Sequence, residues 1–335
     1  MAGESREKQK VVVVGGTGLL GYYAVKEFMR RGHSVTVVAL PPLPEEGLFP
    51  REVDVILANI DELDDSSLTD TLRGQDAIVF AAGADDRVIP KAPAYDFFYQ
   101  ANVRSCKRVL SLARESGVRR GVILSSYFLH FDRTWPEEKL SEYHPYIRSR
   151  KEQAEQSMDV SMPDLQLMIL ELPYIFGSMP GRTPLWKPLI DYINSRYPLF
   201  YVRGGTNMIA VEHVGEAIVG AIEKGKRGHS YTVGDENLTW VEFLERMLGV
   251  LGKRKRIVIV PTCLVRLILR LVGLHHKLRG TESGLDPARF AATQTRRTFF
   301  DPAPAAEELG YGRGNLEEAF KDTVEACLRV RSESS

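Results

Sequence analysis

Residues 11–21 read VVVVGGTGLLG, in which four valines run straight into glycines at positions 15, 18 and 21. Glycines at this spacing let a chain turn tightly and approach a pyrophosphate, while the next helix offers free N–H groups and the positive end of its dipole. The context agrees, because an amphipathic helix is expected over 19–31 and Gly32 ends it. The stretch therefore predicts a dinucleotide-binding turn, with a structural turn of another α/β protein as the alternative.

Short apolar stretches then alternate with helical segments. This alternation predicts parallel strands joined by right-handed crossovers, with ligands beyond the carboxyl ends of the strands. The expected fold class is α/β, a Rossmann doubly wound parallel sheet with a smaller C-terminal mixed α/β substrate lobe. Strands are expected at 34–39, 54–58, 77–82, 121–124 and 165–170, and helices at 66–72, 95–116, 145–158 and 214–224.

Two regions are expected from where this alternation loosens. A dinucleotide-binding domain covers 1–177, and 206–228 return to it. The substrate lobe is assigned 178–205 and 229–335, which are rich in glycine, proline and aromatic residues or irregular in pattern.

Composition excludes several classes of partner. The 335 residues include 44 basic and 44 acidic side chains, so no long-range field favours nucleic acid. Residues 1–10 are polar rather than signal-like, and three cysteines without paired spacing indicate a reducing, cytoplasmic location. The histidines and cysteines show no spacing typical of metal ligands, and we expect no metal.

Ser126, Tyr146, Arg150 and Lys151 form a second informative group. Ser126 ends an expected strand, and Tyr146 opens an expected helix that also carries the two cations. A phenol can exchange a proton with a carbonyl or alcohol oxygen when a neighbouring cation lowers its pKa from about 10, and a serine hydroxyl can hold the same oxygen. These residue types predict acid–base chemistry beside a nicotinamide.

Over nearly its whole length the chain resembles the extended (atypical) short-chain dehydrogenases/reductases of the NAD-dependent epimerase/dehydratase superfamily, especially their dihydroflavonol-reductase-like branch. The likeness rests on GGTGLLG at 15–21, AAG at 81–83, Ser125-Ser126, and YTVG at 231–234. It implies a Rossmann fold, NAD(P) chemistry and catalysis by the four residues above. The cofactor-binding residues that it implies are Gly15, Thr17, Gly18, Leu19, Leu20, Gly21, Asn59, Ile60, Ala81, Ala82, Gly83, Asn102, Pro173 and Ile175.

The chain departs from the family's Tyr-x-x-x-Lys pattern. Arg150 stands four residues after Tyr146, and Lys151 follows it. At roughly 100° per residue the fourth position faces the tyrosine and the fifth does not, so Arg150 is expected in the site. A one-residue π-bulge would instead return Lys151, and both alternatives stay open.

Three further departures concern the cofactor and its surroundings. Ala39-Leu40 stands where NAD-specific members carry an acid for the ribose, which favours NADP over NAD without excluding NAD. Asn59 replaces an aspartate at the adenine side and can still hydrogen-bond the base. Glu171 replaces an arginine, and the sequence suggests no role for it.

The expected function is NAD(P)(H)-dependent reduction or oxidation of a carbonyl/alcohol pair on a small, fairly apolar substrate. One alternative is a nucleotide-sugar epimerase/dehydratase, disfavoured because 207–210 read NMIA where such enzymes have an arginine-containing segment. Another is a non-catalytic dinucleotide sensor or assembly protein. Residues expected to face the substrate are Phe97, Phe98, Tyr174, Phe176, Trp186, Tyr201 and Met208.

The apolar stretch 262–277 carries Arg266, Arg270 and Lys277 along one stripe and is too short to span a membrane. Contact with a lipid surface, or a portal for a lipophilic substrate, is one interpretation. The expectation is instead a helix that buries its apolar face on the C-terminal lobe. A homodimer through the long helices beside the sheet is implied by the family resemblance.

Overall fold

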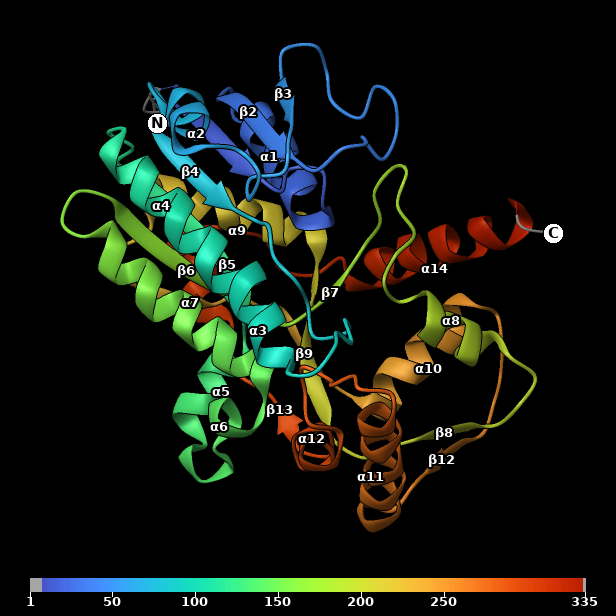
Figure 1. The fold of residues 1–335 in the computed structure, drawn as a ribbon. Coiled ribbons are helices and arrows are strands. Elements are labelled where there is room, and N and C mark those ends of the chain that lie inside the picture. Colours follow the sequence, from blue (N-terminus) through green and yellow to red (C-terminus); the bar gives the residue numbers. More distant parts are fainter. Residues whose placement is uncertain (1–7, 334–335) are drawn as a thin grey trace.

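A computed structural model describes residues 8–333, with side chains through Arg329; residues 1–7 of the polar start lie outside the described residues. Within this range seven strands form one parallel sheet in the order β10-β6-β5-β4-β1-β2-β3 (Figure 1). The strands are β1 (Lys10–Val14), β2 (Ser34–Ala39), β3 (Asp54–Leu57), β4 (Ala77–Phe80), β5 (Arg120–Ser126), β6 (Gln166–Leu172) and β10 (Ser230–Thr232).

Helices cover both faces of this sheet, as Figure 1 shows. One face packs on α1 (Leu19–Arg30) and α9 (Val211–Lys224), and the other on α2 (Asp65–Leu72), α4 (Ser105–Glu115) and α7 (Pro145–Ser161). Fully buried valines of β1 contribute to both apolar clusters, as the alternation of side chains along a strand requires. The predicted Rossmann fold class is confirmed.

The strand order reverses between β1 and β4, because β1 pairs with β2 on one side and β4 on the other. A reversal of this kind opens a crevice at the carboxyl ends of the strands. The turn after β1 and the segments after β4, β5 and β6 therefore meet at one edge of the sheet.

The C-terminal lobe is built on a small sheet of mixed direction. Its strands are β7 (Tyr174–Phe176), β9 (Gly205–Ala210), β11 (Glu236–Thr239) and β13 (Arg297–Thr298), with a separate pair formed by β8 (Leu199–Tyr201) and β12 (Ile257–Ile259). An aromatic core around Phe176, Trp240 and Phe320 holds this sheet to its helices. These helices are α8 (Lys187–Asn194), α10 (Trp240–Val250) and α14 (Leu316–Glu333).

The remaining helices lie in connecting segments. The short ones are α3 (Ala94–Phe98), α5 (Phe128–Thr134), α6 (Leu140–Tyr143), α12 (Pro287–Gln294) and α13 (Ala303–Leu309), with a 3-10 turn at Pro136–Glu138. The long α11 (Thr262–Leu278) packs mainly beside α12 (Figure 1).

One expected helix differs from the prediction. Residues 95–116 are divided into α3, a π-helical turn at Tyr99–Arg104, and α4. Asn102 lies in this wider turn. Its buried side-chain amide hydrogen-bonds Ala84 and Ser149 in neighbouring segments.

Candidate active site

The glycine turn after β1 is too tight for larger residues. Gly15 has φ +85°, and a Cβ there would lie 2.8 Å from the backbone of Ala81. A Cβ on Gly21 would overlap the carbonyl oxygen of Gly15. The turn therefore presses its backbone against the end of β4, where predicted cofactor residues 81–83 line the same cleft.

The N-terminus of α1 is free to receive an anion. Its N-cap, Gly18, has no side chain to bond the first N–H groups, and the first turn carries no acid. Gly18, Leu19 and Leu20 open onto the cleft. Uncapped N–H groups and the helix dipole suit the pyrophosphate of a dinucleotide, so the residues present fit the predicted cofactor.

Asn59 and Ile60, which were predicted to bind the adenosine part of the cofactor, make hydrogen bonds to nearby residues. Asn59 accepts from the N–H of Asp61 at 3.1 Å and donates to Glu62 at 2.8 Å. The carbonyl of Ile60 accepts from Arg108 at 2.7 Å. Both follow β3 at the cofactor edge, but neither belongs to the walls of the cleft.

Asn102 is fully buried behind the cleft. Its Oδ1 accepts from the N–H of Ala84 at 2.8 Å, and its Nδ2 donates to Ser149 Oγ at 3.2 Å. Asn102 therefore positions the segment after β4 relative to α7. Its contact with the cofactor stays a prediction.

Ser126 and Tyr146 line the same cleft, Ser126 from the end of β5 and Tyr146 from the start of α7. The backbone N–H of Tyr146 donates to the carbonyl of Gly284 at 2.9 Å, and Leu285 packs in the same apolar cluster. The start of α7 therefore packs against a segment from the far end of the chain. Pro173 and Ile175, after β6, also line the cleft.

Arg150 and Lys151 point in different directions. The Arg150 guanidinium carbon lies 5.3 Å from the centre of the Tyr146 ring, and its nitrogens donate to the carbonyls of Leu124 and Ala84 at 3.3 and 3.1 Å. Lys151 is half exposed and pairs with Asp132 at 3.1 Å. Arg150, four residues after Tyr146, therefore faces the phenol ring, as regular α-helical geometry predicts. Helix α7 contains no π-bulge that would turn Lys151 toward Tyr146.

The pKa of Tyr146 is raised above its ordinary value. Burial is the largest cause, Arg150 opposes it, and the Asp86 carboxylate adds to the increase. The sequence argument required a cation that lowers this pKa, and Arg150 acts in that direction, but burial outweighs it. The phenol is therefore protonated at neutral pH.

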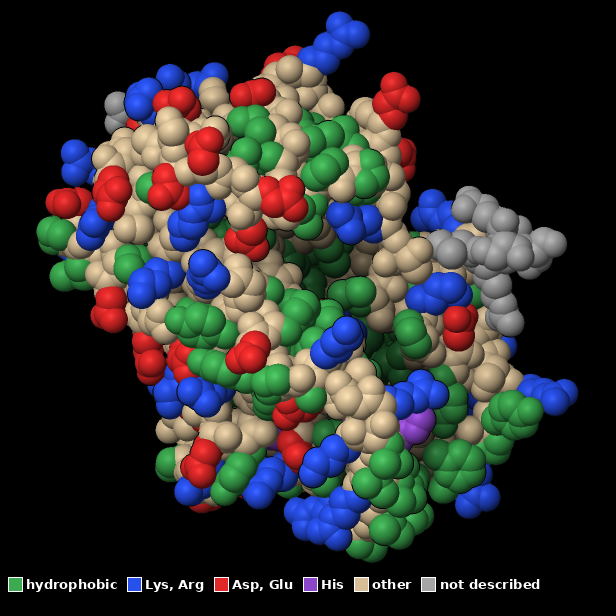
Figure 2. All heavy atoms as spheres, viewed as in Figure 1, with side chains coloured by type: hydrophobic (Ala, Val, Ile, Leu, Met, Phe, Trp, Pro, Cys, Tyr) green, Lys and Arg blue, Asp and Glu red, His purple; other side chains and the backbone are tan. Residues whose placement is uncertain are grey.

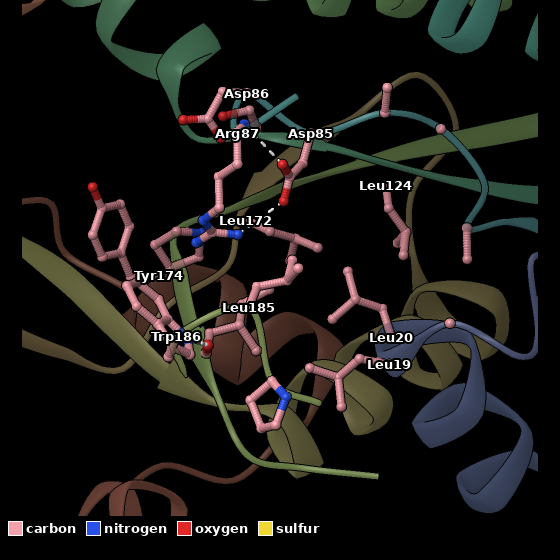
Figure 3. Close-up of a pocket in the computed structure, with 18 of the residues that line it drawn as sticks. Leu19, Leu20, Asp85, Asp86, Arg87, Leu124, Leu172, Tyr174, Leu185 and Trp186 are labelled. Atoms are coloured by element: carbon pink, nitrogen blue, oxygen red, sulfur yellow. Dashed lines mark hydrogen bonds and ion pairs between the residues drawn. The ribbon is translucent and has the colours of Figure 1, made fainter. Parts of the chain in front are cut away.

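The cleft has a volume of about 860 Å³ and contains charged residues that sequence reasoning missed. Figure 3 shows Asp85 and Asp86 near one end, Tyr174 and Trp186 along one wall, and Leu19 and Leu20 of α1 on the facing wall. Asp85 accepts from Arg87 at 2.8 Å. Arg87 also lies over the Trp186 ring, 4.9 Å from its centre. In the sequence, the only signal for these residues was the run Asp85-Asp86-Arg87 after the expected strand 77–82.

A second missed residue is Arg182, in the loop after β7. Its Nε donates to the carbonyl of Thr17 at 2.8 Å, across the mouth of the glycine turn. A Cβ on the preceding Gly181 would overlap Pro44, so this loop also packs closely on the segment after β2. No spacing in the sequence relates these distant segments.

The expected aromatic wall is present only in part. Tyr174, Trp186 and Tyr201 line the cleft, whereas Phe98, Phe176 and Met208 are buried in the apolar cores. Phe97 is exposed and lies outside the cleft walls. The pattern of aromatic residues could not separate core positions from cleft positions.

Glu171, for which the sequence suggested no role, is fully buried in β6. Both of its carboxylate oxygens accept from Arg133, at 2.7 and 2.8 Å. This two-bond pair offsets the cost of burying a carboxylate and holds α5 against the sheet.

The chain belongs to the NAD dependent epimerase/dehydratase family, whose family model matches residues 11–234. Solved structures of NAD-dependent epimerases share the fold described above, and the relatives of this chain include oxidoreductases and epimerases.

Two relatives and one solved structure illustrate the range. A Synechocystis sp. protein, provisionally named dihydroflavonol 4-reductase, is 22% identical over 93% of this chain and 92% of its own. A Dictyostelium discoideum decarboxylating sterol-4-alpha-carboxylate 3-dehydrogenase is 20% identical over 81% of this chain and 85% of its own. The Bacillus cereus UDP-glucuronic acid 4-epimerase with NAD has 12% identity and a TM-score of 0.69, covering 96% of this chain and 99% of that one.

Across residues 8–333, the longest apolar helices all fall short of what crossing a membrane requires.

Proposed function

We propose that this protein reduces a carbonyl group on a small, fairly apolar substrate with NADPH or NADH. The observation that carries the proposal is the protonated, buried phenol of Tyr146 in the cleft beside the glycine turn, with Arg150 against its ring. A proton donor next to a dinucleotide site is what carbonyl reduction requires.

The glycine turn and the N-terminus of α1 would hold the dinucleotide, whose reduced nicotinamide would supply a hydride to the carbonyl carbon. Tyr146 gives its proton to the carbonyl oxygen, and the phenolate then takes a proton from water. Ser126 holds the oxygen through its hydroxyl, and Arg150 stabilises the transient phenolate. Tyr146 and Ser126 both face the cleft, which supports these roles.

Apolar substrate character is supported by the wall around Leu172, Leu185 and Trp186. The Asp86 carboxylate has a raised pKa because of burial, and it lies in the same cavity. Because burial favours the neutral acid form, Asp86 is compatible with an apolar substrate. Leu40, 60% exposed after β2, leaves no carboxylate to repel a 2′-phosphate, so we propose NADPH as the preferred cofactor.

The test is calorimetric titration with NADPH and NADH, followed by turnover of the bound cofactor on a panel of apolar aldehydes and ketones. We expect tighter binding of NADPH and consumption of reduced cofactor with at least one carbonyl compound. Binding of neither cofactor would refute the proposal, and binding without turnover on any carbonyl would favour the non-catalytic alternative.

A further inference from the structure

Helix α11 exposes most of its apolar side chains. Of its described residues only Val265 is buried, whereas Leu267 is 54% exposed, Leu271 60% and Leu278 79%. Leu264, Ile268, Val272 and Leu274 are exposed as well. The expectation that this helix buries its apolar face on the C-terminal lobe is therefore wrong, because the face turned to the lobe is the narrow one around Val265.

The exposed side chains form one continuous face. At about 100° per residue, Leu264, Ile268 and Leu271 project within about 60° of one another, and their mean direction lies about 90° from that of the buried Val265. We call Leu264, Leu267, Ile268, Leu271, Val272, Leu274 and Leu278 the outer face of α11. Figure 2 shows it as a cluster of hydrophobic side chains at the foot of the molecule, with Lys and Arg beside it. An exposed patch of this kind marks an interaction surface.

The charge on α11 and on the chain segments that flank it in sequence has one sign. The sequence has no aspartate or glutamate between Arg246 and Glu282, although the chain as a whole is neutral. Basic residues in this acid-free stretch are Lys253, Arg254, Lys255, Arg256, Arg266, Arg270, Lys277 and Arg279. Arg266, Arg270 and Lys277 are exposed along one flank of the outer face.

This charge pattern selects among possible occupants. A second copy docked through the same face would bring two sets of these cations together, because a two-fold contact places like residues near one another. A bilayer surface with anionic headgroups instead pairs with the cations while its acyl boundary receives the leucines.

We propose that the outer face of α11 binds the surface of an anionic lipid bilayer, with the helix lying in the plane of the interface. The leucines enter the boundary between headgroups and acyl chains, and Arg266, Arg270 and Lys277 contact the lipid phosphates.

The chain after α11 leads directly to the candidate active site. Gly280 accepts from the N–H of Ala92, and Glu282 donates its N–H to Pro90 while its side chain accepts from the N–H of Ala94. Gly284 then accepts from Tyr146. A bound bilayer would therefore lie near the wall of the cleft, although docking does not depend on the proposed reaction.

The test is flotation of the full chain with vesicles of phosphatidylcholine alone and with added phosphatidylserine. We expect binding to the anionic vesicles, weakened by salt because screening reduces the attraction of exposed charges. The double variant Leu267→Glu/Leu271→Glu should bind roughly tenfold less or weaker still, since two apolar side chains are lost from the interface. Arg266→Gln/Arg270→Gln should reduce the preference for phosphatidylserine.

Leu57→Glu is the matched control, because Leu57 is an exposed leucine (41%) on edge strand β3. It should bind vesicles like the unmodified chain, and all variants should keep their unfolding temperature since the substituted side chains are exposed. Equal binding by the unmodified chain and the leucine double variant would overturn the proposal. So would absence of binding to anionic vesicles, or a dimer by light scattering that the double variant alone dissociates, which would assign the face to a second copy.

Discussion

Helices α7 and α11 each have 17 residues, and their surroundings are the reverse of what their compositions suggest. The polar α7 buries seven side chains, among them Tyr146, Arg150 and Gln153, whereas the apolar α11 buries one. Several buried polar groups in α7 meet partners, such as the carbonyls of Leu124 and Ala84 that accept from Arg150. The contrast shows that the sequence predicts where the polar and apolar faces of a helix lie, but not which of these faces is buried against the rest of the protein.

The largest effect is expected at the first turn of α7. Tyr146→Phe removes the proposed proton donor, and kcat/KM for carbonyl reduction should fall by roughly 10³-fold, the size typical of general acid catalysis. Cofactor affinity should change little, as calorimetry can verify. Tyr143→Phe is the control, because Tyr143 lies in α6 outside the cleft walls and should leave the rate unchanged. Comparable rates in the two variants would show that Tyr146 is not the proton donor.

The two faces of α11 can be compared by introducing the same charge on each. Val265→Asp places a carboxylate in the buried side and should lower the free energy of unfolding by about 3 kcal/mol. Leu271→Asp lies on the outer face and should change it by less than about 0.5 kcal/mol. Urea denaturation measures both. Equal losses would mean that the outer face is covered in the native protein.

Adjacent cations of α7 provide a narrower comparison. Arg150→Met should lower kcat/KM by about tenfold and move the alkaline limb of the reduction profile to higher pH, since loss of Arg150 raises the pKa of Tyr146 further. Lys151→Met removes a half-exposed cation that contacts Asp132 and Ser141, away from the phenol, and should change the rate less than about twofold. A pH–rate profile for each variant decides which cation acts on the phenol, and a shift confined to Lys151→Met would reverse the assignment.

The smallest effect concerns His144, the N-cap of α7. Burial lowers its pKa to about 4, and its Nδ1 accepts from the N–H of Asp286 at 3.0 Å. The unfolded chain binds the proton more readily, so stability falls as pH drops below about 6.5 toward 4. Between pH 7 and 5.5 the loss should be about 1 kcal/mol. Urea titrations of His144→Gln should lack this part of the slope, and an unchanged slope would assign it to other groups.

The sequence was most informative where local pattern and chemistry coincide. The turn at 15–21 and the fold class follow from it, because glycine spacing and strand alternation are local properties. The direction of Arg150 agrees with helical geometry. What the sequence did not indicate depends on distant contacts: Arg182 over the glycine turn, Gly284 against Tyr146, and the ion pair of Glu171 with Arg133. The exposure of α11 was predicted wrongly because its apolar face is wider than the lobe can cover.

The hydrogen bond between Tyr146 and Gly284 also orders the assembly of the site during synthesis. All seven strands of the large sheet have been synthesised once Thr232 is added, so the glycine turn can form while residue 284 is still to be made. A product ending between 235 and 283 would lack this hydrogen bond, and it would also lack Leu309 and Tyr311, which are buried in the apolar core beside α9. The last sixth of the chain therefore completes both the core of the large sheet and the surroundings of Tyr146.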